Sequence, residues 1–202
     1  SEGSSIADDL SEIFTIKNTT VINATSPITK SIQDADFNLS ATSNNPNAIS
    51  YSSSDNGIVG VDSDGKVQIK SAGTAVITLS QTASEFFGPG VKTVSISITK
   101  DVPVLTNFPD INKIFGDPDF QLVSPASTSD GSFSYTSSDP SVASIDATSG
   151  EVTILKAGIT TITSTQSSTS NFNSASIAAT LTVSKANQQI IIGTLPDEKT
   201  IL

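Results

Sequence analysis

The chain repeats itself, and this repetition is the strongest constraint on its fold. The run Tyr51-Ser-Ser-Ser-Asp55 recurs 84 residues later as Tyr135-Thr-Ser-Ser-Asp139. The run Lys70-Ser-Ala-Gly-Thr-Ala-Val-Ile-Thr78 recurs as Leu155-Lys-Ala-Gly-Ile-Thr-Thr-Ile-Thr163. An internal repeat of this length is typical of an array of similar domains. We therefore expect tandem units of roughly 85 residues, each large enough to bury its own core.

Three alternating runs that end in lysine mark where each unit closes: Phe14-Thr-Ile-Lys17, Ile96-Ser-Ile-Thr-Lys100 and Leu181-Thr-Val-Ser-Lys185. They predict one complete repeat over residues 18–100 and a second over residues 101–185. Residues 1–17 are then a leader and the last strand of a preceding repeat. Residues 186–202 begin a truncated third repeat, so we interpret the chain as a window from a longer array.

The composition excludes most enzyme chemistry. The sequence has no Cys and no His, which excludes a thiol nucleophile, a Ser-His-Asp triad and a zinc or copper site. Its carboxylates lie on turns between Ser and Gly, where no apolar pocket raises a pKa for glycosidase chemistry. The net charge of −10 opposes binding to nucleic acid, and no apolar run is long enough for membrane insertion.

The local pattern predicts strands almost throughout. Val94-Ser-Ile-Ser-Ile98 and Leu181-Thr-Val183 alternate strictly, so each should bury one face, with Ser and Thr on the outer face. Asp64-Gly65 predicts a two-residue hairpin turn. Tyr51 and Tyr135 should face the core, with the hydroxyl reaching a partner at its rim. Short strands separated by turns of this kind favour a β-sandwich.

The ordered series of motifs resembles a known family. Tyr-Ser/Thr-Ser-Ser-Asp, then Val-Gly-Val-Asp62 or Ala-Ser-Ile-Asp146, a turn glycine, a Val-x-Ile strand and Ala-Gly-x-x-x-Ile-Thr look like the group 2 bacterial immunoglobulin-like domain of invasin and intimin stalks. The resemblance implies an all-β fold of tandem immunoglobulin-like antiparallel β-sandwiches arranged end to end. It implies no catalytic residues and no cofactor.

The function that the resemblance implies is a non-enzymatic stalk or spacer of a long extracellular surface protein or adhesin, which displays a distal binding part. Its partners would be the neighbouring repeats and a host surface protein or glycan. Two alternatives stay open: a fibre or decoration protein on a virus or phage particle, where the partners are other virion subunits, and a carbohydrate- or protein-binding module.

Two groups of residues are candidates for a site. Asp62 and Asp64 of one turn, with Asp117 and Asp119 next, would offer oxygen ligands to calcium, which needs six to eight of them. Phe86 and Phe87 lie in Ser84-Glu-Phe-Phe-Gly-Pro-Gly90, where the two repeats differ most, and paired aromatics exposed on a loop would contact a partner. The alternative is that one of them closes the end of the sandwich, as Phe172 would in the second repeat.

Overall fold

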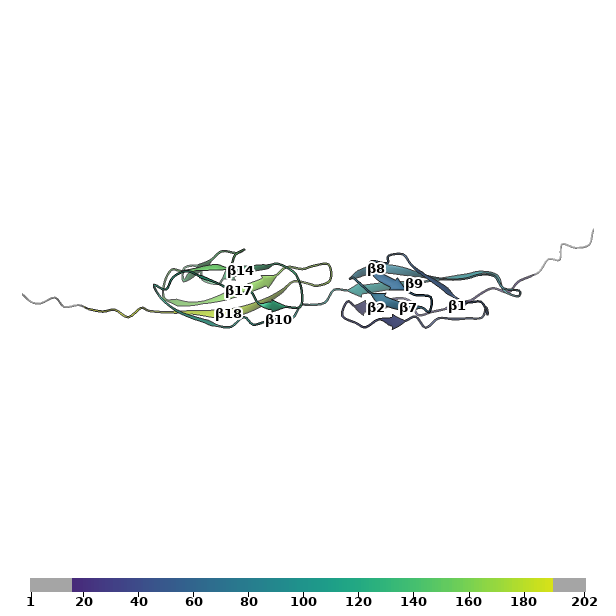
Figure 1. Ribbon diagram of the computed structural model, residues 1–202, viewed down its shortest axis with the longest axis horizontal. Helices are drawn as coiled ribbons and strands as arrows, with labels where there is room; N and C mark the ends of the chain where they lie inside the picture. The colour runs from purple at the N-terminus through teal and green to yellow at the C-terminus, as the bar shows by residue number, and fades with distance from the viewer. Residues whose placement is uncertain (1–15, 191–202) are drawn as a thin grey trace, which may run out of the picture. The chain divides into compact units, whose positions relative to one another are not determined.

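The computed structural model describes residues 16–190, and these form two compact units that divide between Asp101 and Val102 (Figure 1). We call them unit 1 and unit 2. The described residues form strands and turns without any helix, and so contain no helix that would cross a membrane. Residues 1–15 of the segment 1–17, predicted as a leader and the last strand of a preceding repeat, and residues 191–202 of the predicted third repeat over 186–202 lie outside the described part.

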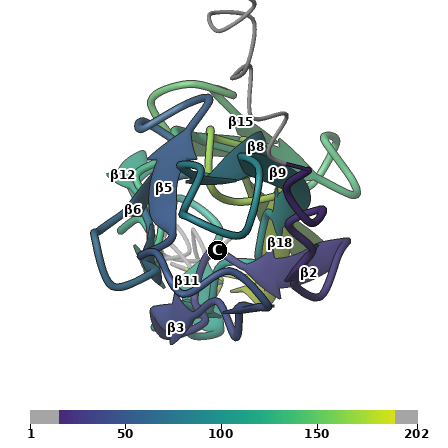
Figure 2. The same cartoon turned by 90° about the vertical axis from the view of Figure 1, so that its right-hand side faces the viewer.

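Unit 1 contains two main sheets and a short ribbon. Its strands are β1 (Ile22–Asn23), β2 (Ile28–Ser31), β3 (Phe37–Asn38), β4 (Thr42–Ser43), β5 (Ser50–Ser53), β6 (Val59–Val61), β7 (Lys66–Ile69), β8 (Gly73–Gln81) and β9 (Gly90–Thr99). The sheet orders are β2-β9-β8-β5, β3-β7-β6 and β1-β4. Figure 2 views this unit end on, with β8 and β9 on one side and β3 on the other.

Unit 2 repeats this arrangement strand for strand. Its strands are β10 (Leu105–Thr106), β11 (Ile111–Ile114), β12 (Phe120–Gln121), β13 (Ala126–Ser127), β14 (Phe133–Ser137), β15 (Ala143–Ile145), β16 (Glu151–Ile154), β17 (Gly158–Gln166) and β18 (Ala175–Ser184). The sheet orders are β11-β18-β17-β14, β12-β16-β15 and β10-β13. The four- and three-stranded sheets of each unit confirm the predicted all-β class of tandem immunoglobulin-like sandwiches.

Each sandwich is held by a core of alternating side chains. The long strands β8 and β17 bury the same positions in the same order, as the period of two along a strand requires. Ile77 and Leu79 are fully buried on β8, and Ile162 is fully buried on β17. The facing sheets contribute Val67 in unit 1 and Val152 in unit 2, both without exposed surface. The two cores are therefore built from equivalent positions.

One strand pair in each unit is parallel, which the predicted antiparallel arrangement did not include. β2 runs parallel to β9, with Ile28 opposite Ile96 and Ser31 opposite Thr99. β11 runs parallel to β18 in the same way. The reason is topological: β2 lies near the start of the unit and β9 at its end, and both run in the same direction along one edge of the sheet.

Two details of the prediction are wrong. The predicted two-residue turn at Asp64-Gly65 is a longer connection, since four residues separate β6 from β7. Asp62 holds this connection: its N–H donates to Lys66 O, and its Oδ1 accepts from the amides of Asp64 and Lys66. Gly65 has a positive φ of 80°. Ser and Thr also do not always face outward, since Thr160 and Ser164 are buried on β17. Tyr135 is confirmed as a core residue, and its hydroxyl lies 2.7 Å from Ser124 Oγ at the rim.

A buried glutamine ties together the loop end of each sandwich. In unit 2, Gln166 Nε2 donates to Ser129 O at 3.0 Å and to Gly131 O at 2.7 Å, and its Oε1 accepts from Ser127 Oγ. In unit 1, Gln81 makes the equivalent bonds to Asn45 O, Asn47 O and Ser43 Oγ. Because the glutamine side chains are buried, these bonds satisfy amide groups that would otherwise be costly to remove from water.

Candidate binding surfaces

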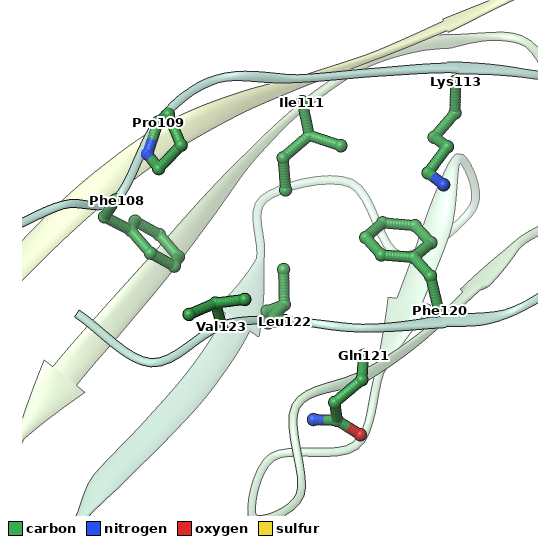
Figure 3. Close-up of a pocket in the computed structure, with 8 residues that line it drawn as sticks. All are labelled: Phe108, Pro109, Ile111, Lys113, Phe120, Gln121, Leu122 and Val123. Carbon is green, nitrogen blue, oxygen red and sulfur yellow. The ribbon is translucent and has the colours of Figure 1, made fainter.

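A groove of about 270 Å³ lies between β11 and β12 of unit 2 (Figure 3). Phe108 and Ile111 point into the groove from one segment, and Phe120 and Leu122 line it from the other segment. The two segments belong to different sheets, so the groove is the open edge of the sandwich. We call it the edge groove.

One cation covers part of the edge groove. Lys113 Nζ lies 4.4 Å from the centre of the Phe120 ring, a cation–π contact that also shields the ring from water. The lining residues include no carboxylate and no nucleophile: they are Phe108, Pro109, Ile111, Lys113, Phe120, Gln121, Leu122 and Val123. The arrangement therefore suits the seating of a small apolar group, whereas acid–base chemistry has no suitable groups there.

The edge groove is a property of unit 2. Unit 1 has the equivalent lysine and phenylalanine, with Lys30 Nζ 5.6 Å from the Phe37 ring centre. At the positions of Phe108 and Val123, however, unit 1 has Thr25 and Ser40, and the hollow that these two residues line there is mostly polar. Sequence comparison of the two repeats at a fixed offset of 83 residues is the signal that could have found this difference.

The aromatic loop predicted in unit 1 places its two phenylalanines differently. Phe86 is 64% exposed, whereas Phe87 is half-buried and its carbonyl accepts from Ser84 N–H at 2.9 Å. In unit 2, Phe172 O accepts from Thr169 N–H at the same distance, so Phe87 and Phe172 occupy equivalent positions. Phe86 is thus the aromatic residue that unit 1 presents to solvent.

Three of the predicted calcium ligands, Asp62, Asp117 and Asp119, accept hydrogen bonds within their own units. In unit 1, Asp62 supports the β6–β7 loop through the amides of Asp64 and Lys66. In unit 2, Asp117 Oδ2 accepts from Ile114 N–H at 2.9 Å and Asp119 Oδ2 accepts from Thr153 Oγ1 at 3.1 Å. Within residues 16–190 no three acidic side chains lie close enough to hold a metal ion together.

Two carboxylates of unit 2 are tuned by their turns. The hydroxyl of Ser141 donates to Asp139, and this bond, with the Ser141 amide, lowers the pKa of the Asp139 carboxyl. The Ser149 amide donates to Asp146 Oδ1 at 2.7 Å and lowers the pKa of that carboxyl. Both groups therefore stay ionised near neutral pH and hold loops in place.

Comparison with known families gives one match in each unit. The intimin immunoglobulin-like domain family matches residues 41–83 and residues 121–168. These segments run from just before β4 to the β8–β9 loop in unit 1, and from β12 to the β17–β18 loop in unit 2. A search of curated protein sequences gives no match.

Several solved structures are similar at low identity. Drosophila N-cadherin EC1-3 is 17% identical, with a TM-score of 0.33 over 85% of this chain and 69% of that chain. Sidekick-1 immunoglobulin domains 1-5 are 15% identical, with a TM-score of 0.36 over 82% and 39%. Domains 1-6 of the surface layer protein SbsC are 16% identical, with a TM-score of 0.33 over 76% and 23%. The chain spans less than two fifths of the length of the last two.

Proposed function

We propose that this chain, whose two units each match the intimin immunoglobulin-like domain family, is a non-enzymatic stalk segment of an extracellular surface protein and that it bears mechanical load. The stalk would display a distal binding part and transmit force from that part to the cell. The observation that carries the proposal is the parallel pairing of the first long strand of each unit with its last.

Parallel pairing determines how a pulling force reaches the hydrogen bonds. A force that acts on the two ends of unit 1 pulls β2 toward its start and β9 toward its end. Because the two strands run in the same direction, all bonds of the ladder are then loaded together in shear. An antiparallel terminal pair would open one bond at a time. The pairing of β11 with β18 gives unit 2 the same resistance.

The ladder continues beyond the strands. In unit 1, Ile32 N–H donates to Thr99 O at 3.0 Å, and in unit 2, Phe115 N–H donates to Ser184 O at 2.8 Å. Earlier in unit 1, Asn18 is bridged in parallel to Phe87. The chain is therefore fastened to the unit before β2 as well as after it, which suits a segment under tension.

The non-enzymatic part of the proposal is supported by how the described acidic residues are used. Asp55, Asp62, Asp139 and Asp146 each accept backbone N–H groups in turns, and those bonds hold the ends of strands. Catalytic pairs need carboxylates in environments that push their pKa values apart. Carboxylates that each hold a turn of the backbone fit a scaffold instead.

Single-molecule force spectroscopy of the full chain tests the proposal. Pulled from its ends, the chain should unfold in two separate high-force events, one for each unit. Each event should lengthen the chain by about 250 Å, since about 85 residues extend at about 3.4 Å each and the folded unit already spans some of that length. The unfolding force should also be well above that of the same chain pulled across β8 and β9, which are antiparallel neighbours.

A matched pair of proline variants isolates the ladder. Ile32 N–H donates to Thr99 O next to the ladder, whereas Ser31 N–H points away from β9 and donates to Asp34 Oδ2. Because successive amides of a strand point to opposite sides, Lys30 N–H faces β9 and Thr29 N–H does not. Lys30→Pro removes one ladder bond and should lower the unfolding force of unit 1, while Thr29→Pro and Lys30→Ala keep the ladder and should not. Equal weakening by Lys30→Pro and Thr29→Pro would overturn the load-bearing role.

A further inference from the structure

Exposed apolar side chains gather at the end of unit 2 where β18 stops. They are Ile114, Phe115, Leu155 and Ile159, and Ile159 is 66% exposed. The register places two of them near the end of β18, because Ile114 is opposite Ser184 on one side and Ile159 is opposite Thr182 on the other. Phe115 and Lys156, the neighbour of Leu155, line one hollow at this end. We call these four residues the apolar rim. Beside them lies an open hollow of about 530 Å³, in which the charged residues are Lys156 and Lys185.

The equivalent end of unit 1 is more polar. Equivalent hydrogen bonds identify the matching positions in the two units. Leu155 N–H donates to Val142 O as Lys70 N–H donates to Ile58 O. Ile114 N–H donates to Asp117 Oδ2 as Ser31 N–H donates to Asp34 Oδ2. Ile159 and Thr74 each follow the first glycine of a long strand. Unit 1 thus has Ser31, Lys70 and Thr74 where unit 2 has three of its four rim residues. A shared fold does not require the rim, so another contact must account for it.

The opposite end of unit 1 carries the exposed aromatic residue, and its backbone is held rigidly. Phe86 O accepts from Asn18 N–H at 2.8 Å, Gly88 N–H donates to Asn18 O at 2.9 Å, and Lys17 Nζ donates to Ser84 O at 2.6 Å. The Asn47 amide also donates to Ala83 O at 3.1 Å. These bonds restrain the backbone at Phe86, which lowers the entropic cost of ordering the loop on binding.

This loop also differs from the equivalent loop of unit 2, because it has an acidic and an aromatic side chain where unit 2 has two neutral polar ones. Glu85 and Phe86 are replaced in unit 2 by Ser170 and Asn171, which follow the equivalent Thr169. Unit 1 thus offers an exposed phenyl ring beside a carboxylate. Unit 2 offers an apolar rim beside the ammonium groups of Lys156 and Lys185. The two departures from the common repeat are alike in being apolar, and Glu85 is opposite in charge to Lys185, a lysine that unit 1 also has as Lys100.

We propose that the Glu85–Phe86 loop of one copy of this chain binds the apolar rim of a second copy, with Phe86 against Phe115 and Glu85 near Lys185. The contact joins different surfaces, so it is heterologous and each complex keeps a free loop and a free rim. It is small and exposed at both partners, which gives the affinity of a transient contact, with Kd of about 0.1 to 1 mM.

Sedimentation velocity of the full chain, from about 10 µM to about 1 mM, tests the proposal. The wild type should associate as concentration rises, and Phe86→Ser and Ile159→Ser should each weaken association by about tenfold or more. Val123→Ser serves as the control, since it removes from the edge groove an apolar side chain that is 81% exposed, more than either Phe86 or Ile159. Association that is absent at the highest concentration, or equally weakened by Val123→Ser, would overturn the proposal.

Two further variants distinguish a heterologous contact from one between like ends. Phe86→Ser protein keeps its rim and Ile159→Ser protein keeps its loop, so each alone should remain monomeric, while their mixture should form a one-to-one dimer and no larger species. A mixture that stays monomeric contradicts the proposal. Glu85→Lys and Lys185→Glu should each weaken association, and the double variant should recover most of the loss; no recovery means that the two charges do not meet.

Discussion

The ring of Tyr135 lies directly against Gly150: a Cβ atom on this glycine would come within 3.0 Å of the tyrosine Cε2. Gly150 also has a positive φ of 76°, a conformation that costs an L-residue about 1 kcal/mol. Unit 1 contains the same pair, with a Cβ on Gly65 falling 2.9 Å from Tyr51 Cζ. The position therefore requires glycine for two reasons: its φ is positive, and the tyrosine ring leaves no room for a Cβ atom.

Gly150→Ala should lower the free energy of unfolding of unit 2 by about 2 kcal/mol, because it adds the ring contact to the backbone strain. Gly116→Ala is the matched control. Gly116 also has a positive φ, of 99°, but nothing lies within 4 Å of the added methyl group, so it should cost only the backbone term. Equal losses for the two variants would show that the Tyr135 ring simply moves aside.

Urea unfolding followed by tyrosine fluorescence measures this difference in one unit at a time. The chain has two tyrosines, one in each unit. In a Tyr51→Phe background the signal therefore comes from Tyr135 alone, and unit 2 can be analysed as a two-state transition.

The buried amide of Gln166 gives a second prediction. Gln166→Glu keeps the shape of the side chain but replaces the donor with an acceptor, so Ser129 O and Gly131 O lose their partner and face a carboxylate. We expect a loss of about 3 kcal/mol or more in unit 2, since a buried charge is left beside two carbonyl oxygens. Gln68→Glu, on the exposed face of β7, should be near neutral; similar losses would mean that the amide bonds are unimportant.

Gln166 also shows what the local sequence pattern does not reveal. Gln81 and Gln166 continue the buried phase of β8 and β17, two residues beyond Leu79 and Ser164, and they recur 85 residues apart. Strand period and repetition together could have identified them as buried. Glutamine is usually exposed, however, and the carbonyls that it satisfies come from a loop about 35 residues earlier, which no local pattern reveals.

The strands, the core and the two units follow from features that sequence displays directly: alternation, turn residues and an 83- to 85-residue offset. The edge groove and the apolar rim do not, because each joins residues from separate strands. Phe86 lies where the two repeats differ most, a difference that the sequence itself displays, whereas an isoleucine in a strand pattern, such as Ile159, is normally assigned to the core. Differences between repeats therefore mark candidate surfaces only when each is placed on the fold.

Ser164 gives a third prediction, of a stabilising substitution. Its hydroxyl is buried and has no hydrogen-bond partner in the described structure, and the equivalent residue of unit 1 is Leu79. Ser164→Ala removes the unsatisfied group and should raise the free energy of unfolding of unit 2 by about 1 kcal/mol. Thr160→Val should do the opposite, since Thr160 Oγ1 lies 2.8 Å from Ser137 Oγ and accepts from Asp139 N–H. A loss of stability in Ser164→Ala would contradict this account.

The turn carboxylates predict how stability changes with pH. The folded-state pKa values of Asp139 and Asp146 are lowered, so their contribution is present above the unfolded pKa of about 3.9 and is lost as pH falls through the folded pKa. The Tm of unit 2 should be flat from pH 7 to about pH 5 and should fall below about pH 4. The Tm values of wild type and Asp146→Asn should converge as pH falls; Asp64→Asn, in the loop of unit 1, is the control and should leave the unit 2 curve unchanged.

Calcium gives the last prediction. Asp62 already binds two amides of its own loop, and Asp117 and Asp119 are hydrogen-bonded to Ile114 N–H and Thr153 Oγ1. A calcium ion would need six to eight oxygen ligands around one point, and drawing these carboxylates together would break the turns that they hold. The Tm of the full chain should therefore be the same in millimolar calcium and in EDTA. A rise with calcium that Asp117→Asn abolishes would show that the domain rearranges to bind the ion, and a rise that Asp62→Asn abolishes would place the site in unit 1.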